Sequence, residues 1–249
     1  MLKIAYTKRI IAFIDILGFS KLVFDSSNDN DSLIKLNELV SSLSSSMPEY
    51  VKKLYANNIP ERLIPKYLYI SDCIILSCPI DDQDKNWRHY DGLNVVAMIS
   101  SILTHKFLDL GFLLRGGIEI GDVWFEENNI VGPAYIEAHF LEKNAGNPII
   151  KLSDKAKERW QVKYHGDNLC FEYDNNFIVN TLIFKYMDQK YADKAYEAGY
   201  DHYTEAADKE IKCIEKWDDS CEEKENEKMK ALAKWDWIKN YISFSKVQL

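Results

Sequence analysis

The sequence predicts an α+β fold, in which helices cover one face of a sheet, followed by a mainly helical C-terminal part. Short apolar runs alternate with stretches of helical periodicity, in the order strand, helix, hairpin, helix, strands, helix, strand. From about Phe177 the composition shifts toward Lys, Glu, Ala and Asp, with few glycines or prolines. The 249 residues suffice for one domain and a helical appendage. We therefore expect a main domain at 1–165 and an extension at 166–249.

The first expected element is a buried strand at 10–17, where isoleucine predominates. Beyond it, leucines recur at helical spacing and predict a helix from 31 to about 55. The segment KYLYISDCIILSCP, at 66–79, has two short apolar runs on either side of Ser71 and Asp72. This pattern is typical of a hairpin that carries an acid in its turn.

Five elements are expected between the hairpin and the extension. A helix at 93–110 precedes LLRGGIEIGDVWF, at 113–125, where alternation predicts strands and glycine pairs indicate bulges or close backbone approach. A helix with proline in its first turn is expected at 133–143. A strand at 149–153 and a helix at 154–160 then complete the main domain.

The extension is expected to form two long helices over 185–240, joined by a charged turn near 218–227. Its apolar side chains recur at helical spacing and include tryptophans, so we expect them to pack against another surface rather than remain in a solvated tail. These positions are Ile211, Ile214, Trp217, Met229, Leu232, Trp235 and Ile238.

Composition and charge exclude several classes of function. The formal net charge of −8 argues against a surface for duplex nucleic acid. No apolar stretch has membrane-spanning length, and no secretory signal is visible, so we expect a cytoplasmic protein that binds no membrane. The five cysteines lack paired metal-ligand spacing and are expected to be reduced. A polyanionic substrate would therefore have to arrive with metal ions.

Two carboxylates stand out by their context. Asp15 lies at the end of the buried strand and Asp72 lies in the hairpin turn, so neighbouring strands would bring both acids to one edge of the sheet. Like charges this close need a compensating cation, and a pair of divalent ions is the economical one. The turn from Gly18 to Ser20 would present backbone amides to phosphate oxygens. The alternative is that Asp72 serves only the turn and Asp15 caps the next helix.

Four segments resemble the catalytic domain of class III nucleotidyl cyclases. FIDILGFSKLV resembles the first metal motif, and YISDCIILS resembles the second, with Ser71 in place of a glycine. LRGGIEIGDVW and NIVGPAYIEAHFLE resemble the strand and helix that follow. The resemblance covers about 10–153 and implies a ferredoxin-like, palm-type sheet covered by helices.

The resemblance also implies a reaction and its residues. The 3′-hydroxyl of a nucleoside triphosphate attacks the α-phosphate and releases pyrophosphate, in a homodimer with the site between two subunits. Two Mn²⁺ or Mg²⁺ ions would be held by the carboxylates of Asp15 and Asp72, the catalytic pair, and by the carbonyl of Ile16. The residues expected to contact substrate are Phe13, Gly18, Phe19, Ser20, Asn129 and Tyr135.

The chain departs from purine cyclases at the base-reading positions, Leu68 and Asn129, and at the transition-state positions, Ile136 and Phe140. Either the domain is a catalytically inactive regulator or it uses a rebuilt pocket for another base. The costly acid pair favours catalysis, since an inactive site has no reason to retain it.

The segment GPAYIEAHFLE, at 132–142, resembles the bacterial pyrimidine cyclases of the Pycsar anti-phage systems. This resemblance implies cyclic UMP or cyclic CMP as a messenger for a separate effector, with UTP favoured over CTP. The amide of Asn129 could bond a pyrimidine edge, and Tyr135 and His139 could replace the changed helix residues. We expect Arg115 to brace its strand and Glu142 to form a structural ion pair.

Two hypotheses of other classes are weaker. A non-catalytic nucleotide-binding or dimerisation module would not need the two acids. A palm-like polymerase or diguanylate cyclase shares the two-acid logic, but the hairpin reads ISDCI and has no GGDEF-like turn.

Overall fold

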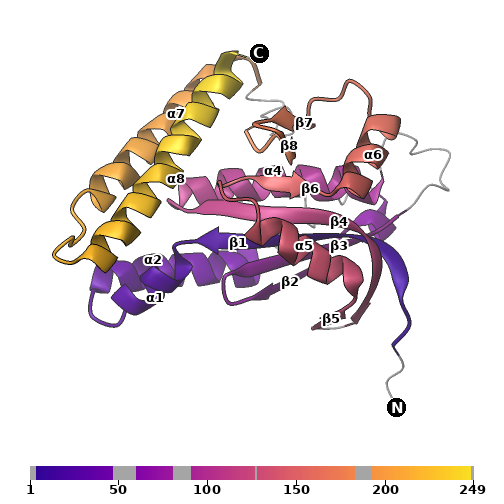
Figure 1. The fold of residues 1–249 in the computed structure, drawn as a ribbon, viewed down its shortest axis with the longest axis horizontal. Coiled ribbons are helices and arrows are strands. Elements are labelled where there is room, and N and C mark those ends of the chain that lie inside the picture. The colour runs from indigo at the N-terminus through magenta and orange to yellow at the C-terminus, as the bar shows by residue number, and fades with distance from the viewer. Residues whose placement is uncertain (1–3, 47–59, 81–90, 127, 183–191, 248–249) are drawn as a thin grey trace.

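The computed structural model describes residues 4–46, 60–80, 91–126, 128–182 and 192–247. Its N-terminal half has the order strand, helices, two strands, helix, strand (Figure 1). The elements are β1 (Thr7–Leu17), α1 (Phe19–Asp25), α2 (Asn30–Ser41), a π-helical turn (Ser42–Ser46), a 3₁₀ turn (Glu61–Leu63), β2 (Lys66–Ile70), β3 (Cys73–Pro79), α4 (Gly92–Asp109) and β4 (Leu113–Glu126). The predicted helix from 31 to 55 is seen up to Ser46, and the rest lies outside the described residues.

The predicted α+β sheet is confirmed. Its first four strands lie in the order β2-β3-β1-β4, with β1 antiparallel to both β3 and β4. This order, with helices connecting β1 to β2 and β3 to β4, is the ferredoxin-like split arrangement. It makes β1 a central strand, so the end of β1 lies directly beside the β2–β3 turn.

The second half of the chain extends this sheet and then leaves it. The elements are β5 (Asn129–Val131), α5 (Pro133–Lys143), β6 (Ile150–Leu152), α6 (Asp154–Lys163), β7 (Cys170–Tyr173), β8 (Asn176–Val179), α7 (Ala192–Ile214) and α8 (Glu222–Val247). The sequence did not indicate β7 and β8, which continue the sheet beyond β6. Each has only four residues, and the hairpin turn at Asp174 and Asn175 takes positive φ angles of 49° and 59°.

The two faces of β1 pack against different partners. Ile10 and Ile14 belong to the large core under α2 and α4, whereas Ile11 and Phe13 pack against Ala138 of α5 on the opposite face. The expectation that helices cover one face is therefore incomplete, because α5 covers part of the second. Side chains alternate along a strand, so Asp15 points to the same side as Ile11 and Phe13.

Strand β4 is one continuous strand of 14 residues, without the interruption that its glycines suggested. Its register against β1 runs unbroken from Val123, opposite Thr7, to Leu113, opposite Leu17, which excludes a bulge in this pairing. Gly117 instead allows close approach: a Cβ there would lie 2.4 Å from the carbonyl oxygen of Ala138. The glycines thus let α5 sit directly on the sheet.

The two predicted C-terminal helices are present as α7 and α8, which lie side by side near α1 and α2 (Figure 1). Their buried side chains, including Tyr203, Trp235 and Ile238, form a second core with Leu108 and Leu113 of the main domain. Of the helical positions expected to pack, Met229 is the exception and is 60% exposed. No described helix is long and apolar enough to cross a membrane.

Candidate metal and nucleotide site

Asp15 and Asp72 lie together at the edge of the sheet, as the strand order requires. The backbone N–H of Ile16 donates to the carbonyl oxygen of Asp72 at 2.9 Å, which ties the hairpin turn to the end of β1. Ligand atoms of Asp15, Asp72 and Cys73 all lie within 4.8 Å of one another. The end of β1 and the β2–β3 turn therefore bring the carboxylates of Asp15 and Asp72 together.

The hairpin turn places Asp72 through an unusual residue conformation. Ser71 has a φ of 57°, in the left-handed region that glycine usually occupies. This is the position at which the resembled cyclase motif has a glycine. Ser71 thus adopts a conformation that glycine takes more readily, at a cost of about 1 kcal/mol or more.

The charge of Asp15 is only partly compensated. Its pKa is raised to about 6, chiefly by burial and also by the nearby Glu142 and Asp72, while Arg115 and Lys234 act in the opposite direction. Arg115 lies opposite Asp15 in the sheet, but its guanidinium is 3.4 Å from the Asp15 carboxylate and donates at 2.6 Å to the buried Glu142. Arg115 thus braces α5 against β4, as expected, and leaves Asp15 with one long contact.

The donor set fits a hard divalent cation. Asp15 and Asp72 offer carboxylate oxygens, and the backbone of Ile16 lines the same cleft. Cys73 is less suitable as a ligand, because burial raises the pKa of its thiol to about 12 and its Sγ lies 3.5 Å from Oδ1 of Asp72 as a donor. A cation here would relieve the repulsion between Asp15 and its acidic neighbours.

The predicted phosphate turn is the start of a helix. Gly18 has a φ of 85° and caps the seven-residue α1, so Phe19 and Ser20 form the first helical turn. No heavy atom lies within 4 Å of the place a Gly18 Cβ would occupy, so the glycine serves backbone conformation rather than close packing. All three residues line the same cleft as Asp15.

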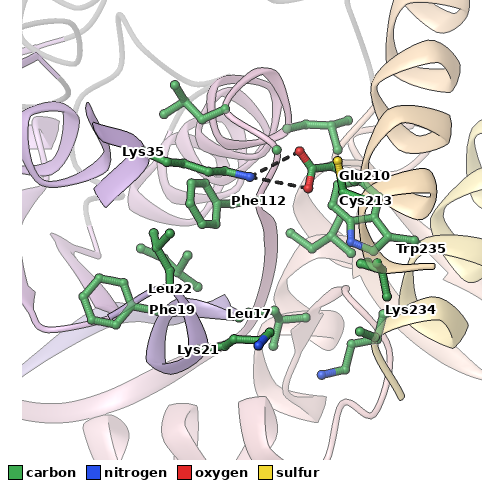
Figure 2. Close-up of a pocket in the computed structure, with 18 of the residues that line it drawn as sticks. Leu17, Phe19, Lys21, Leu22, Lys35, Phe112, Glu210, Cys213, Lys234 and Trp235 are labelled. Carbon is green, nitrogen blue, oxygen red and sulfur yellow. Dashed lines mark hydrogen bonds and ion pairs between the residues drawn. The ribbon is translucent and has the colours of Figure 1, made fainter. Parts of the chain in front are cut away.

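This cleft has a volume of about 1260 Å³ and is bounded by two parts of the chain (Figure 2). One wall comes from β1, α1 and α2, and the other comes from α7 and α8. Glu210 of α7 connects the walls through an ion pair with Lys35 of α2 at 3.2 Å. The sequence does not indicate this second wall, since lysines and acids on amphipathic helices do not show which surface the helices cover.

Other expected substrate residues lie away from the cleft. Phe13, Asn129 and Tyr135 are not among the described residues that line it. The Phe13 ring instead packs against Tyr135, with centroids 5.8 Å apart, and His139, at 4.7 Å, on the α5 side of the sheet. Asn129 is exposed in β5, far from α7 and α8 (Figure 1). Cys73, which belongs to the acid cluster, packs in the same apolar cluster as Phe13 and Tyr135, so these two residues lie near the acid pair but outside the cleft.

The structure also shows the surroundings of residues at positions where the chain departs from the purine cyclase pattern, and of two residues near the hairpin. Ile136 and Phe140 of α5 are 58% and 62% exposed, so they offer an apolar surface rather than polar groups. Near the hairpin, Lys66 donates to the carbonyl oxygen of Phe125 at 2.8 Å, and Tyr67 donates to that of Leu43 at 3.2 Å. These contacts give Lys66 and Tyr67 structural roles.

No protein-family model matches the chain, and no curated protein matches it. Solved structures do resemble it. The adenylyl cyclase CyaB from P. aeruginosa matches with 14% identity and a TM-score of 0.47, covering 72% of this chain and 94% of that one. An adenylate/guanylate cyclase/hydrolase from Silicibacter pomeroyi matches with 15% identity and a TM-score of 0.44, covering 71% and 96%.

A third match is the catalytic core of a rhodopsin-guanylyl cyclase with converted specificity, in complex with ATPαS. It has 13% identity and a TM-score of 0.43, and it covers 70% of this chain and 92% of that one. At these identities the likeness concerns the course of the chain and not its chemistry. The function therefore has to be argued from the residues of the site.

Proposed function

We propose that the protein is a pyrimidine nucleotide cyclase that converts UTP to 3′,5′-cyclic UMP and pyrophosphate. The main support is the pair formed by Asp15 and Asp72, two acids on adjoining strand ends whose charges the protein leaves partly uncompensated. The pair opens into a cleft large enough for a nucleoside triphosphate. A site with these properties suits phosphoryl transfer assisted by divalent ions.

In this proposal Asp15, Asp72 and the carbonyl of Ile16 hold two Mn²⁺ or Mg²⁺ ions. Such ions supply charge neutralisation on the triphosphate and a lower pKa for the attacking hydroxyl. The ribose 3′-oxygen forms a bond to the α-phosphorus as the bond to the bridging oxygen breaks, and the electron pair leaves on pyrophosphate. The 3′-hydroxyl proton passes to solvent. Gly18, Phe19 and Ser20 shape the turn that faces the phosphates.

The enzyme is proposed to act as a homodimer, because Asn129 lies in β5 and does not line the cleft that the acid pair lines. Ile136 and Phe140 present exposed apolar side chains on α5, the helix that also contains Tyr135. A second copy that buries this surface would bring its own Asn129 and Tyr135, beside Phe13, toward the nucleotide. The base would then be read by residues other than those that hold the ions.

The biological role proposed with this activity is antiviral. Cyclic UMP would act as a cytoplasmic second messenger for a separate effector in a Pycsar anti-phage system. The cyclase domain of this chain is proposed to end near residue 165, and the C-terminal extension follows it. The resemblance of GPAYIEAHFLE to pyrimidine cyclases supports this role and the preference for UTP; CTP and cyclic CMP are the alternative. We expect a neighbouring gene to encode a cyclic-nucleotide-binding effector with membrane segments.

The test is incubation of purified protein with each of the four nucleoside triphosphates and Mn²⁺, followed by chromatography and mass spectrometry of the products. Cyclic UMP as the main product supports the proposal, and cyclic CMP would support the alternative base. Product from ATP or GTP alone would contradict pyrimidine specificity. Absence of any product would favour a non-catalytic regulatory module, in agreement with apolar Ile136 and Phe140 at transition-state positions.

A further inference from the structure

Helix α8 places Lys234 in the wall of the cleft that faces the acid pair. Lys234 is half-buried and lines the same cleft as Asp15, Asp72 and Arg115. Figure 2 shows Lys21 of α1 and Lys234 of α8 extending into the cleft from opposite walls. A lysine of the C-terminal extension, far from the cyclase-like segments in sequence, thus reaches the region beside Asp15 and Asp72.

The wall that presents Lys234 is held in place by several contacts. Besides the Lys35–Glu210 ion pair, His202 of α7 lies 3.0 Å from Asp109 at the end of α4. The Lys21 ammonium lies 4.6 Å from the centre of the Trp217 ring, between α7 and α8. Next to Lys234, Trp235 is buried in the second core. The position of Lys234 is therefore set by packing and not by a free tail.

Lys234 differs from the other cations of the cleft in its partners. Lys21 pairs with Asp25 at 3.2 Å, Lys35 pairs with Glu210, and Arg115 binds Glu142. Within the described part of the chain, no residue forms a hydrogen bond or an ion pair with the Lys234 ammonium. Lys209 and Lys230 also line the cleft, but both are exposed.

The electrostatic surroundings of Lys234 favour an anionic ligand. Burial lowers its pKa, and the positive charge of Arg115 lowers it further, while Asp15 has the opposite effect. A half-buried ammonium close to a second cation is costly unless an anion neutralises both. If Asp15 instead binds a divalent ion, it no longer balances Lys234. A polyphosphate would then satisfy the ion and the lysine together.

We propose that Lys234 binds the phosphate chain of the nucleotide from within the same subunit that holds the metal pair. The inference rests on the proposed cyclase function and extends it to the C-terminal helices. It assigns to α8 a cation that α5 lacks at the transition-state positions of the resembled purine cyclases, where α5 has Ile136 and Phe140. Lys234 neutralises charge on the β- and γ-phosphates and so favours departure of pyrophosphate.

The test measures binding of magnesium tripolyphosphate by calorimetry, which involves the phosphate chain without base or ribose. Lys234→Gln is expected to weaken binding about tenfold or more, because a charge-assisted contact to phosphate is lost. Lys234→Arg, which keeps the charge, is expected to stay within about threefold of the unmodified protein. Lys212→Gln is the matched control, since Lys212 is exposed on α7 and does not line the cleft. Equal melting temperatures establish that each variant is folded.

Unchanged affinity in Lys234→Gln would overturn the inference, and so would absence of tripolyphosphate binding by the unmodified protein. The outcome is separable from that of the proposed function. A Lys234-dependent affinity in a protein that makes no cyclic nucleotide would defeat the cyclase activity and leave the phosphate contact standing. A protein that makes cyclic UMP with tripolyphosphate affinity indifferent to Lys234 would defeat the phosphate contact alone.

Discussion

A buried aspartate, Asp91, and a half-buried one, Asp15, differ in how far the protein compensates their charges. Asp91, before α4, is fully buried, and its carboxylate has a complete set of donors. These donors are the backbone N–H groups of Leu93 and Asn94, at 2.9 and 3.1 Å, and the side chains of Arg159, Lys163 and Tyr164, at 2.8, 3.2 and 2.7 Å. Among the described residues, the Asp15 carboxylate accepts one side-chain hydrogen bond, from Arg115 at 3.4 Å, and it has two acidic neighbours, Glu142 and Asp72.

Asp91 is thus an acid that stabilises the fold, whereas Asp15 is an acid whose charge the proposed cation would compensate. The donors of Asp91 come from α4 and α6, so its charge connects those helices and needs nothing further. The raised pKa of Asp15 means that its ionised form destabilises the folded protein, because its contacts do not fully compensate the charge. Such a cost is typical of functional sites, where a substrate or ion completes the set.

The largest expected effect is on activity. Asp15→Asn and Asp72→Asn should each lower cyclic-nucleotide formation about 1000-fold or more, because each removes a charged metal ligand. Initial rates with UTP and Mn²⁺ measure this effect. Asp122→Asn is the control, since Asp122 is an exposed acid on β4 outside the cleft. Equal losses in all three variants would contradict a specific role for the pair.

The next effect is on stability at the structural acid. Asp91→Ala should lower the free energy of unfolding by about 3–5 kcal/mol, because it removes the α4 cap and leaves Arg159 and Lys163 without their shared buried carboxylate. Urea unfolding followed by circular dichroism measures it. A change below about 1 kcal/mol would show that the donors of Asp91 are not a stabilising set.

Asp15→Asn should change the free energy of unfolding in the opposite direction and stabilise the protein. In EDTA at pH 7.5 the variant is expected to be more stable by about 1–3 kcal/mol, since the amide removes a buried, poorly compensated charge. Because the folded pKa of Asp15, about 6, exceeds its unfolded value, the native state binds the extra proton. The contribution of Asp15 to the stability of the unmodified protein is therefore lost as pH rises from about 4 to 6. The difference in stability between the unmodified protein and Asp15→Asn grows over that range. A gap independent of pH would contradict this origin.

A smaller effect is expected at Glu142, which competes with Asp15 for Arg115. Glu142→Gln should lower the pKa of Asp15, because it removes a neighbouring negative charge and frees the guanidinium to approach the carboxylate. The pH range over which stability falls should move lower. Unfolding measured from pH 4 to 8 tests this shift. If Glu142 does not act on Asp15, stability will fall over the same pH range in Glu142→Gln and in the unmodified protein.

Local sequence signals predicted much of the sheet and the acid pair. The apolar run of β1, the acid-bearing turn at Asp72 and the proline-led α5 each have a short-range pattern, and antiparallel neighbours necessarily bring Asp15 and Asp72 together. Strands β7 and β8 pair with each other and join the sheet through Lys151 opposite Ile178, a pairing between distant segments that no local pattern indicates. The cleft wall depends on contacts such as Lys35 with Glu210, 175 residues apart, which no local periodicity reveals.

Asp15 and Asp72 are proposed to form a cation site, and direct Mn²⁺ binding tests this proposal without reference to activity. Electron paramagnetic resonance of free Mn²⁺ gives the affinity of the unmodified protein and of Asp15→Asn, Asp72→Asn and Asp122→Asn. We predict that the first two substitutions weaken binding at least tenfold and that Asp122→Asn leaves it unchanged. Equal Mn²⁺ affinity in all four proteins would contradict the account.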